Sequence, residues 1–257
     1  MSDYSRDEMM TVAAARMLWD GCVCFVGIGL PSAACNLARM THAPELVLIY
    51  ESGTIGTRPT VLPLSIGDGE LAETAACVVP LPDIFSDYLQ AGRVDVGFLG
   101  AAQLDRFGNL NSTVIGPYAK PKTRLPGAGG ATEIAAHAKQ VFIVMKASPR
   151  GFVTALDFQT SGGHFKGRAG SGARGSGPAV VVTDVGILKP RPDRELALVA
   201  GYPGITSEEA CAAIGWKLAV APRLEAVAAP TLNELAALRA LEARTAAAHR
   251  QPVRLPL

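Results

Sequence analysis

The chain has 257 residues, of which 49% are hydrophobic, and its formal net charge is +1. This composition supports a substantial core, and the near-zero charge argues against a nucleic-acid partner, which needs a clustered basic excess. No apolar run reaches the roughly 18 residues of a membrane-spanning helix, and the polar first residues differ from a signal peptide, so we expect a cytoplasmic protein without a membrane partner. The five cysteines form no C-x-x-C pair with a nearby histidine, and we expect no metal site.

The first elements in chain order alternate between helices and short apolar strands. Ser5 and Glu8 form a capping-box pattern, and the helical spacing of the apolar residues that follow predicts a helix that ends near Gly21. A strand from Val23 then turns through glycines into a second helix, with Pro31 in its first turn. The next strand, residues 45–50, runs directly into a carboxylate.

The alternation continues through the middle of the chain. Strands that are apolar throughout and alternate with helices indicate a parallel sheet that is covered on both faces. We therefore predict an α/β fold, with a mostly parallel sheet flanked by helices, in one domain over residues 1–257. The predicted elements of this part are helices at 82–93 and 131–139 and strands at 94–101 and 140–146.

The last third of the chain combines strands, helices and a glycine-rich stretch. Residues 178–188 and 195–202 read as paired strands added to an edge of the sheet. Residues 206–217 and 231–249 are predicted to be helical. Residues 161–177 carry too many glycines for a helix or strand interior, so we expect a mobile loop there.

Glu51 is the first candidate for chemistry because it follows a strand that reads as buried. Open α/β sheets bind ligands at the carboxyl ends of their strands, and Ser52 and Gly53 suit a tight turn in which a ligand can approach the backbone. The alternative is that Glu51 is a solvated loop residue or part of a structural ion pair.

Two glycine-containing stretches and one asparagine are further candidates. Gly27 and Gly29 lie between a strand and a helix, where free amides suit an anion. Ser32 breaks the G-x-G-x-x-G pattern of dinucleotide-binding folds, so a nicotinamide site is only an alternative. Asn111 offers an amide donor for an oxyanion, or it belongs to a polar hairpin turn.

The second glycine-containing stretch comes immediately before a predicted helix. Gly127, Gly129 and Gly130 would leave the first amides of that helix free, although a plain connection explains them as well.

Taken together and in order, five segments resemble the beta subunits of family I CoA-transferases. They are FVGIGLPS, IYESGTIG, LPLSIGDGELAET, DVGFLGAAQLDRFGNLNSTVIG and RLPGAGGATEIA. The resemblance implies an open α/β fold of that family, a CoA thioester as substrate and no permanently bound cofactor. It also implies a separately encoded alpha subunit, in an α2β2 assembly, because this chain shows no alpha-subunit signature.

The resemblance also implies roles for the candidate residues. Glu51 would attack the acyl-CoA thioester to give an acyl-glutamyl anhydride and then a glutamyl-CoA thioester, a form of covalent catalysis. Asn111 and the amides of Gly127, Gly129 and Gly130 would stabilise oxyanions. The positions expected to bind CoA or the acid are Gly27, Gly29, Ser52, Gly53, Gly127, Gly130, Lys166 and Arg168.

The substrates that the resemblance implies are succinyl-CoA as donor and 3-oxoadipate as acceptor, in the degradation of aromatic compounds. The distal carboxylate of such an acid needs a cation, for which Arg58 and Arg124 are candidates. Three alternatives remain open: another small dicarboxylic acid such as glutaconate, hydrolysis of CoA thioesters on the same scaffold, and a ligand-binding regulator without catalysis. The presence of Glu51 favours transfer over hydrolysis.

Overall fold

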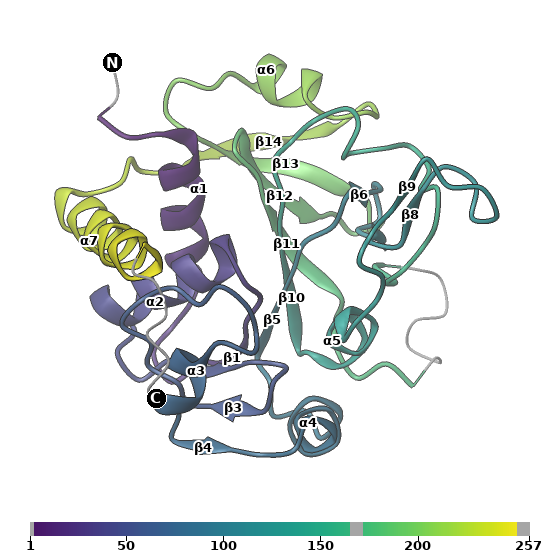
Figure 1. Ribbon diagram of the computed structural model, residues 1–257. Coiled ribbons are helices and arrows are strands. Elements are labelled where there is room, and N and C mark those ends of the chain that lie inside the picture. The colour runs from purple at the N-terminus through teal and green to yellow at the C-terminus, as the bar shows by residue number, and fades with distance from the viewer. Residues whose placement is uncertain (1–2, 165–171, 251–257) are drawn as a thin grey trace.

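The structure is a computed structural model that describes residues 3–164 and 172–250 (Figure 1). Within these residues, ten strands form one sheet in the order β14-β13-β12-β11-β10-β5-β1-β2-β3-β4. Its centre is parallel, as predicted, and consists of β2 (Val47–Ile49), β1 (Val23–Phe25), β5 (Val96–Leu99), β10 (Gln140–Val144) and β11 (Pro178–Val182).

Antiparallel pairs extend this parallel centre at both ends. On one side lie β12 (Gly186–Pro190), β13 (Leu196–Gly201) and β14 (Ala219–Ala226), the last of which runs parallel to β13. On the other side lie β3 (Thr54–Ile55) and β4 (Cys77–Val78). The predicted pairing is confirmed for β12 and β13, but the predicted single strand 178–188 is two strands, because the chain turns where the Thr183 N–H donates to the Gly186 carbonyl, and the first of them, β11, belongs to the parallel centre. The short β2–β3 hairpin becomes important for the site.

Helices cover both faces of the sheet, as Figure 1 shows. The helices α1 (Arg6–Ala15), α2 (Leu30–Thr41) and α7 (Leu232–His249) lie together on one face. The other face carries α5 (Ala131–His137) and two small hairpins, β6 (Gln103–Leu104) with β7 (Leu110–Asn111) and β8 (Val114–Ile115) with β9 (Thr123–Arg124). The shorter helices are α3 (Gly69–Glu73), α4 (Leu81–Asp83), η1 (Ile84–Gln90) and α6 (Ser207–Ala212).

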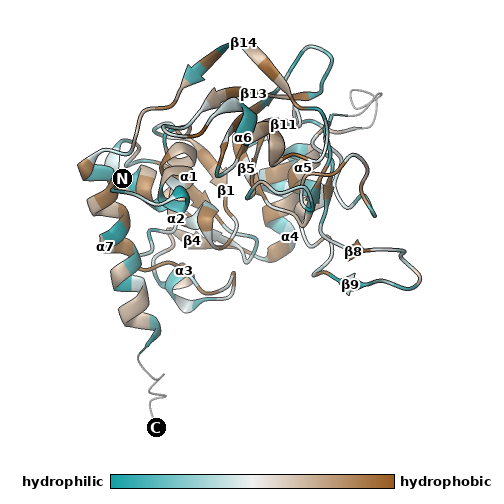
Figure 2. Ribbon diagram, turned by 90° about the horizontal axis from the view of Figure 1, so that it is seen from above, coloured by the Kyte–Doolittle hydropathy of each residue, from teal (hydrophilic) through white to brown (hydrophobic). Residues whose placement is uncertain are grey.

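The hydrophobic core is divided by the sheet into two clusters. One cluster joins α1 and α2 to the sheet through residues such as Met9, Leu37 and Leu48. The other contains Phe25, Ile84 and Ile134 on the opposite face. Figure 2 shows the same layering from above, with α1 and α2 on one side of the central strands and α5 on the other. None of the helices in the described ranges has the length and apolar character to cross a bilayer.

The predicted capping box is confirmed, whereas the predicted end of the first helix is wrong. The Glu8 N–H donates to Ser5 Oγ at 3.1 Å and the Ser5 N–H donates to Glu8 Oε2 at 2.7 Å. The helix ends at Ala15 and not near Gly21, because the N–H groups of Met17 and Leu18 bond three residues back and tighten the chain out of the α-helix.

Two further expectations needed correction. The predicted helix at 206–217 is limited to Ser207–Ala212, and β14, which we did not predict, follows it as an exposed edge strand without the apolar alternation of a half-buried one. Within the predicted helix at 82–93, residues Ile84–Gln90 are π-helical.

The glycine-rich stretch is partly outside the described residues, and the mobility expected of 165–171 stays untested. The described residues beside that gap are held in place. Ser161 bridges to Leu110, the buried His164 ring lies 2.6 Å from the Pro178 carbonyl oxygen, and the Gly175 N–H donates to the Ala136 carbonyl.

Candidate active site

Glu51 occupies the turn of the β2–β3 hairpin. Tyr50 is fully buried at the end of β2, and the Gly53 N–H donates to its carbonyl oxygen at 3.0 Å, which closes a β-turn with Glu51 and Ser52 at its centre. The Tyr50 hydroxyl lies 2.6 Å from Ser32 Oγ in α2, and burial raises the Tyr50 pKa well above its ordinary value. These contacts fix the backbone from which the half-buried Glu51 side chain extends.

Within residues 3–164 and 172–250, the Glu51 carboxylate is not part of a structural ion pair. Among the described residues, no hydrogen bond or salt bridge joins it to another group. A partly buried carboxylate without a protein partner depends on water or a ligand for its hydrogen bonds. This arrangement excludes, within the described chain, the ion-pair alternative that the sequence left open.

Gly129 and Gly130 lie directly against this carboxylate. A Cβ atom built on Gly129 would be 3.9 Å from Glu51 Oε1, and one built on Gly130 would be 3.3 Å from Glu51 Cδ. Within the described residues, the N–H groups of both glycines lack a protein acceptor. The glycine loop therefore places free backbone donors beside the carboxylate, as expected from the sequence.

Gly127 belongs to the same loop but plays a different part. Its N–H donates to the Ser112 carbonyl at 2.8 Å, and its carbonyl accepts from Ser112 Oγ at 2.8 Å. With φ at +102° it takes a conformation that favours glycine. Gly127 thus anchors the loop, and its N–H is already used.

Asn111 is not available as an oxyanion donor in this structure. It is fully buried, and its amide nitrogen donates to Gln103 Oε1 and to the Val114 carbonyl, both at 2.7 Å. Its Oδ1 accepts from the Thr113 N–H at 3.0 Å. The side chain joins the β6–β7 hairpin to the start of β8, and both amide hydrogens are used in these contacts. Asn111 therefore has no free donor for an oxyanion, contrary to the expected role.

Of the two residues after Glu51, Gly53 differs from expectation and Ser52 does not. A Cβ on Gly53 would lie 2.0 Å from the Val79 carbonyl oxygen, so this glycine makes room for the neighbouring backbone and not for a ligand. Ser52 Oγ is buried and has no hydrogen-bond partner among the described residues. Ser52 thus remains a candidate, with a hydroxyl that no protein group uses.

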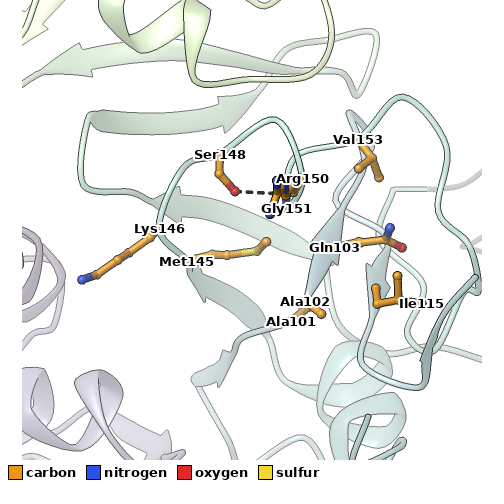
Figure 3. A pocket seen from close by; sticks show the side chains of 10 residues that line it. All are labelled: Ala101, Ala102, Gln103, Ile115, Met145, Lys146, Ser148, Arg150, Gly151 and Val153. Atoms are coloured by element: carbon orange, nitrogen blue, oxygen red, sulfur yellow. Dashed lines mark hydrogen bonds between the residues drawn. The ribbon is translucent and has the colours of Figure 1, made fainter. Parts of the chain in front are cut away.

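Two adjoining cavities run along the carboxyl ends of the central strands. The smaller, of about 340 Å³, is lined by Gly27, Leu30 and Pro31 at the start of α2 and by Leu99 after β5. The larger, of about 700 Å³, is shown in Figure 3 and lies between the end of β10 and the β6 and β8 strands. Both are lined by Met145 and Lys146, so they adjoin at these two residues, and we call the pair the trench; Glu51 is not among the residues that line either cavity.

Gly27, one of the positions expected to bind CoA or the acid, lies in the wall of the smaller cavity. Gly29 does not line the described cavities; it caps α2 with φ at +84°, a conformation that favours glycine. Sequence reasoning missed Lys146 and Arg150, which line the larger cavity. The signal that was available is their position within a few residues of the end of β10.

The candidate cations differ in the contacts that they make. Lys146 pairs with Asp7 at 2.8 Å, whereas exposed Arg150 has no ion pair among the described residues. Arg58 pairs with Glu45 at 3.4 Å, and Arg124 lies 4.9 Å from the centre of the Tyr118 ring. Lys166 and Arg168 lie outside the described residues.

Comparison with known proteins gives independent information on this arrangement. The family model described as coenzyme A transferase matches residues 7–212. The chain is 60% identical, over 98% of both chains, to a subunit of the 3-oxoadipate CoA-transferase of Pseudomonas knackmussii.

Solved structures agree with the sequence comparison. The crystal structure of glutaconate coenzyme A-transferase from Acidaminococcus fermentans matches with a TM-score of 0.85 at 33% identity, covering 92% of this chain and 94% of that one. A crystal structure of the decarboxylase AibA/AibB matches with a TM-score of 0.82 at 26% identity, covering 94% and 96%.

Proposed function

Because the chain belongs to the coenzyme A transferase family, we propose that Glu51 is the acyl acceptor that moves coenzyme A between two carboxylic acids. The observation that carries this proposal is the carboxylate without a partner, held at a fixed turn against free backbone N–H groups of Gly129 and Gly130. The relative at 60% identity is named for 3-oxoadipate, and we take 3-oxoadipate as the acceptor and succinyl-CoA as the donor.

The reaction proceeds through two kinds of covalent intermediate on Glu51. A carboxylate oxygen attacks the thioester carbonyl, the C–S bond breaks, and an acyl-glutamyl anhydride and CoA thiolate result. The thiolate then attacks Glu51 Cδ, which releases the first acid as its carboxylate and leaves a glutamyl-CoA thioester. The second acid follows the same two steps in reverse, and the Glu51 carboxylate is restored. No proton is gained or lost, and the energy of the thioester is retained because each intermediate is an activated acyl group.

Each attack produces a tetrahedral oxyanion beside the glycine loop. Preorganised N–H donors stabilise such charge, and removal of one donor typically costs about 2.7–4 kcal/mol of barrier. The amides of Gly129 and Gly130 are free and adjacent to Glu51. We assign them this role in place of Asn111, whose donors are used inside the fold.

The trench is suited to an extended substrate that ends in an anion. Its walls are largely apolar, from Ala101, Ile115, Met145 and Val153, and Arg150 and Lys146 add positive charge. Guanidinium and ammonium groups bind phosphate and carboxylate oxygens through charge-assisted hydrogen bonds. The trench would thus hold part of the CoA thioester, with Arg150 as the cation that is not already paired.

A second chain completes the site in this proposal. The relative from Pseudomonas knackmussii is named as one subunit of its enzyme, which implies a separate partner chain for that protein. We propose a separately encoded alpha subunit for this chain as well, in an α2β2 assembly. The half-buried Glu51 then becomes enclosed at the interface, where the anhydride is kept from water.

The test uses the purified complex with its alpha subunit and a panel of acids. Glu51→Gln removes the nucleophilic charge while keeping the shape of the side chain, so exchange of CoA from succinyl-CoA is expected to fall to background while thermal unfolding is unchanged. Hydroxylamine should trap an adduct on Glu51 in the unmodified enzyme only. Normal exchange by Glu51→Gln refutes the proposal. Binding of succinyl-CoA without exchange, in both the unmodified complex and the variant, identifies a regulator instead.

A further inference from the structure

Phe85, in the π-helical segment η1, presses on the glycine loop at the point where that loop meets Glu51. A Cβ built on Gly130 would lie 2.7 Å from Phe85 Cζ, 2.8 Å from Phe85 Cε1 and 3.3 Å from Glu51 Cδ. The tip of the Phe85 ring and the Glu51 carboxyl carbon thus both lie beside Gly130. The ring also packs against Phe25 in β1, with 6.0 Å between ring centres.

The π-helical geometry explains how η1 directs one pair of side chains into the core and another pair towards α5. Hydrogen bonds in a π-helix join residues five apart, and residues five apart in η1 share their surroundings. Ile84 and Leu89 are both fully buried in the core. Phe85 and Gln90 both contact the start of α5, the first through Gly130 and the second by donating to Glu133 Oε2 at 2.9 Å.

An α-helix in this place would not bring both pairs to the same faces. Neighbours on an α-helix are three and four residues apart, and residues five apart lie on different faces. π-Helical segments are rare and often lie at functional sites. The π-helical segment therefore has an identifiable consequence: it holds the Phe85 ring against Gly130, the glycine that meets the Glu51 carboxyl.

We propose that Phe85 is the shielding residue that keeps water from the acyl-enzyme intermediates and so makes the site a transferase instead of a hydrolase. This inference rests on the function proposed above. Water attack on the anhydride would break its C–O bond and give the free acid and the Glu51 carboxylate, with CoA thiolate taking up one released proton. The net result is hydrolysis of the thioester, and its rate depends on access of water to the carbonyl carbons.

Phe85 shields Glu51 from this attack because its apolar ring packs on Gly130, at the point where that glycine meets the carboxyl carbon, and takes the place of water molecules there. It donates and accepts no hydrogen bond, so it leaves the amides of Gly129 and Gly130 free for the oxyanion. Truncation of the ring opens space beside Glu51 Cδ, and water is the ligand small enough to fill it.

The experiment measures how the complex divides succinyl-CoA between transfer and hydrolysis. Phe85→Ala is expected to raise the ratio of hydrolysis to transfer by about tenfold, which corresponds to about 1.4 kcal/mol in relative barrier height. Phe85→Leu, which keeps apolar volume, should stay near the original ratio, with Phe85→Val in between. If the alanine variant does not fold, the valine variant decides in its place.

Tyr88→Ala is the matched control. Tyr88 is a partly buried aromatic residue of the same segment whose ring faces Arg93, 5.9 Å away. Like Phe85→Ala, Tyr88→Ala removes an aromatic side chain from η1, but it should leave the ratio of hydrolysis to transfer unchanged.

The possible outcomes separate this inference from the proposed function. A Glu51 adduct in the unmodified enzyme, together with equal losses of transfer and hydrolysis in Phe85→Ala, overturns the shielding role alone. An equal change of the ratio in Tyr88→Ala does the same. Absence of any hydroxylamine-sensitive adduct in the unmodified enzyme overturns the nucleophilic role of Glu51 and this inference with it.

Discussion

Replacing Gly130 by alanine tests how closely the glycine loop fits against the nucleophile. The backbone at Gly130 has φ −80° and ψ 0°, so alanine there meets none of the strain of a positive φ. The effect of the substitution is therefore steric. The new methyl group would lie 2.7 Å from Phe85 Cζ and 3.3 Å from Glu51 Cδ.

The size of the effect follows from these distances. Carbon atoms prefer separations of about 3.5–4.0 Å, so the ring, the loop or the glutamate must move by roughly 1 Å. A misplacement of about 1 Å at a reacting group can lower the rate about 100-fold. Overpacking of this kind costs about 1–3 kcal/mol of stability, so the variant should remain folded with a strongly reduced kcat.

The assay compares kcat for CoA exchange with thermal unfolding of the same complex. Gly129→Ala is the contrasting variant, because φ at +48° makes alanine strained there by about 1–2 kcal/mol, while its methyl group would meet Glu51 Oε1 only at 3.9 Å. Its stability should fall with a smaller loss of kcat. A folded Gly130→Ala variant with unchanged kcat refutes the close fit. Partial recovery of kcat in the double variant Gly130→Ala, Phe85→Leu would locate the clash at the Phe85 ring.

Three further predictions follow from single contacts. Asn111→Leu should lower the free energy of unfolding by about 1–3 kcal/mol, because buried acceptors lose their donors; a folded variant whose loss is confined to kcat would instead restore Asn111 as an oxyanion donor. Arg150→Ala should raise KM for the CoA thioester and leave kcat nearly unchanged, and an unchanged KM removes Arg150 from the binding site. The Arg16 guanidinium lowers the Glu234 pKa from 4.5 to about 2, so this pair stabilises the fold above pH 4.5 and the gain is lost as pH falls towards 2. Acid unfolding followed by circular dichroism should show that Glu234→Gln removes part of this pH dependence; an identical pH profile contradicts it.

Much of the fold could be predicted because its signals are local. The Ser5–Glu8 capping box, the helical spacing behind it and the apolar strands each depend on residues within a few positions. Apolar strands that alternate with helices are typical of a parallel sheet, and the centre of this sheet is parallel. Where the local signal was weak, as in the exposed edge strand β14, or where it could not separate an α-helix from a π-helix, as in η1, the prediction was wrong.

The candidate site shows the same difference between local signals and contacts made by distant segments. The amino-acid order by itself placed Glu51 at the end of a buried strand, and the motifs around it indicated the coenzyme A transferase family, which the comparisons confirm. Side-chain and backbone partners are set by segments far apart in the chain, which only the sheet order brings together. The tertiary structure alone decided that Gly130 meets Glu51, that Gly53 makes room for Val79, and that the Asn111 amide is used within the fold.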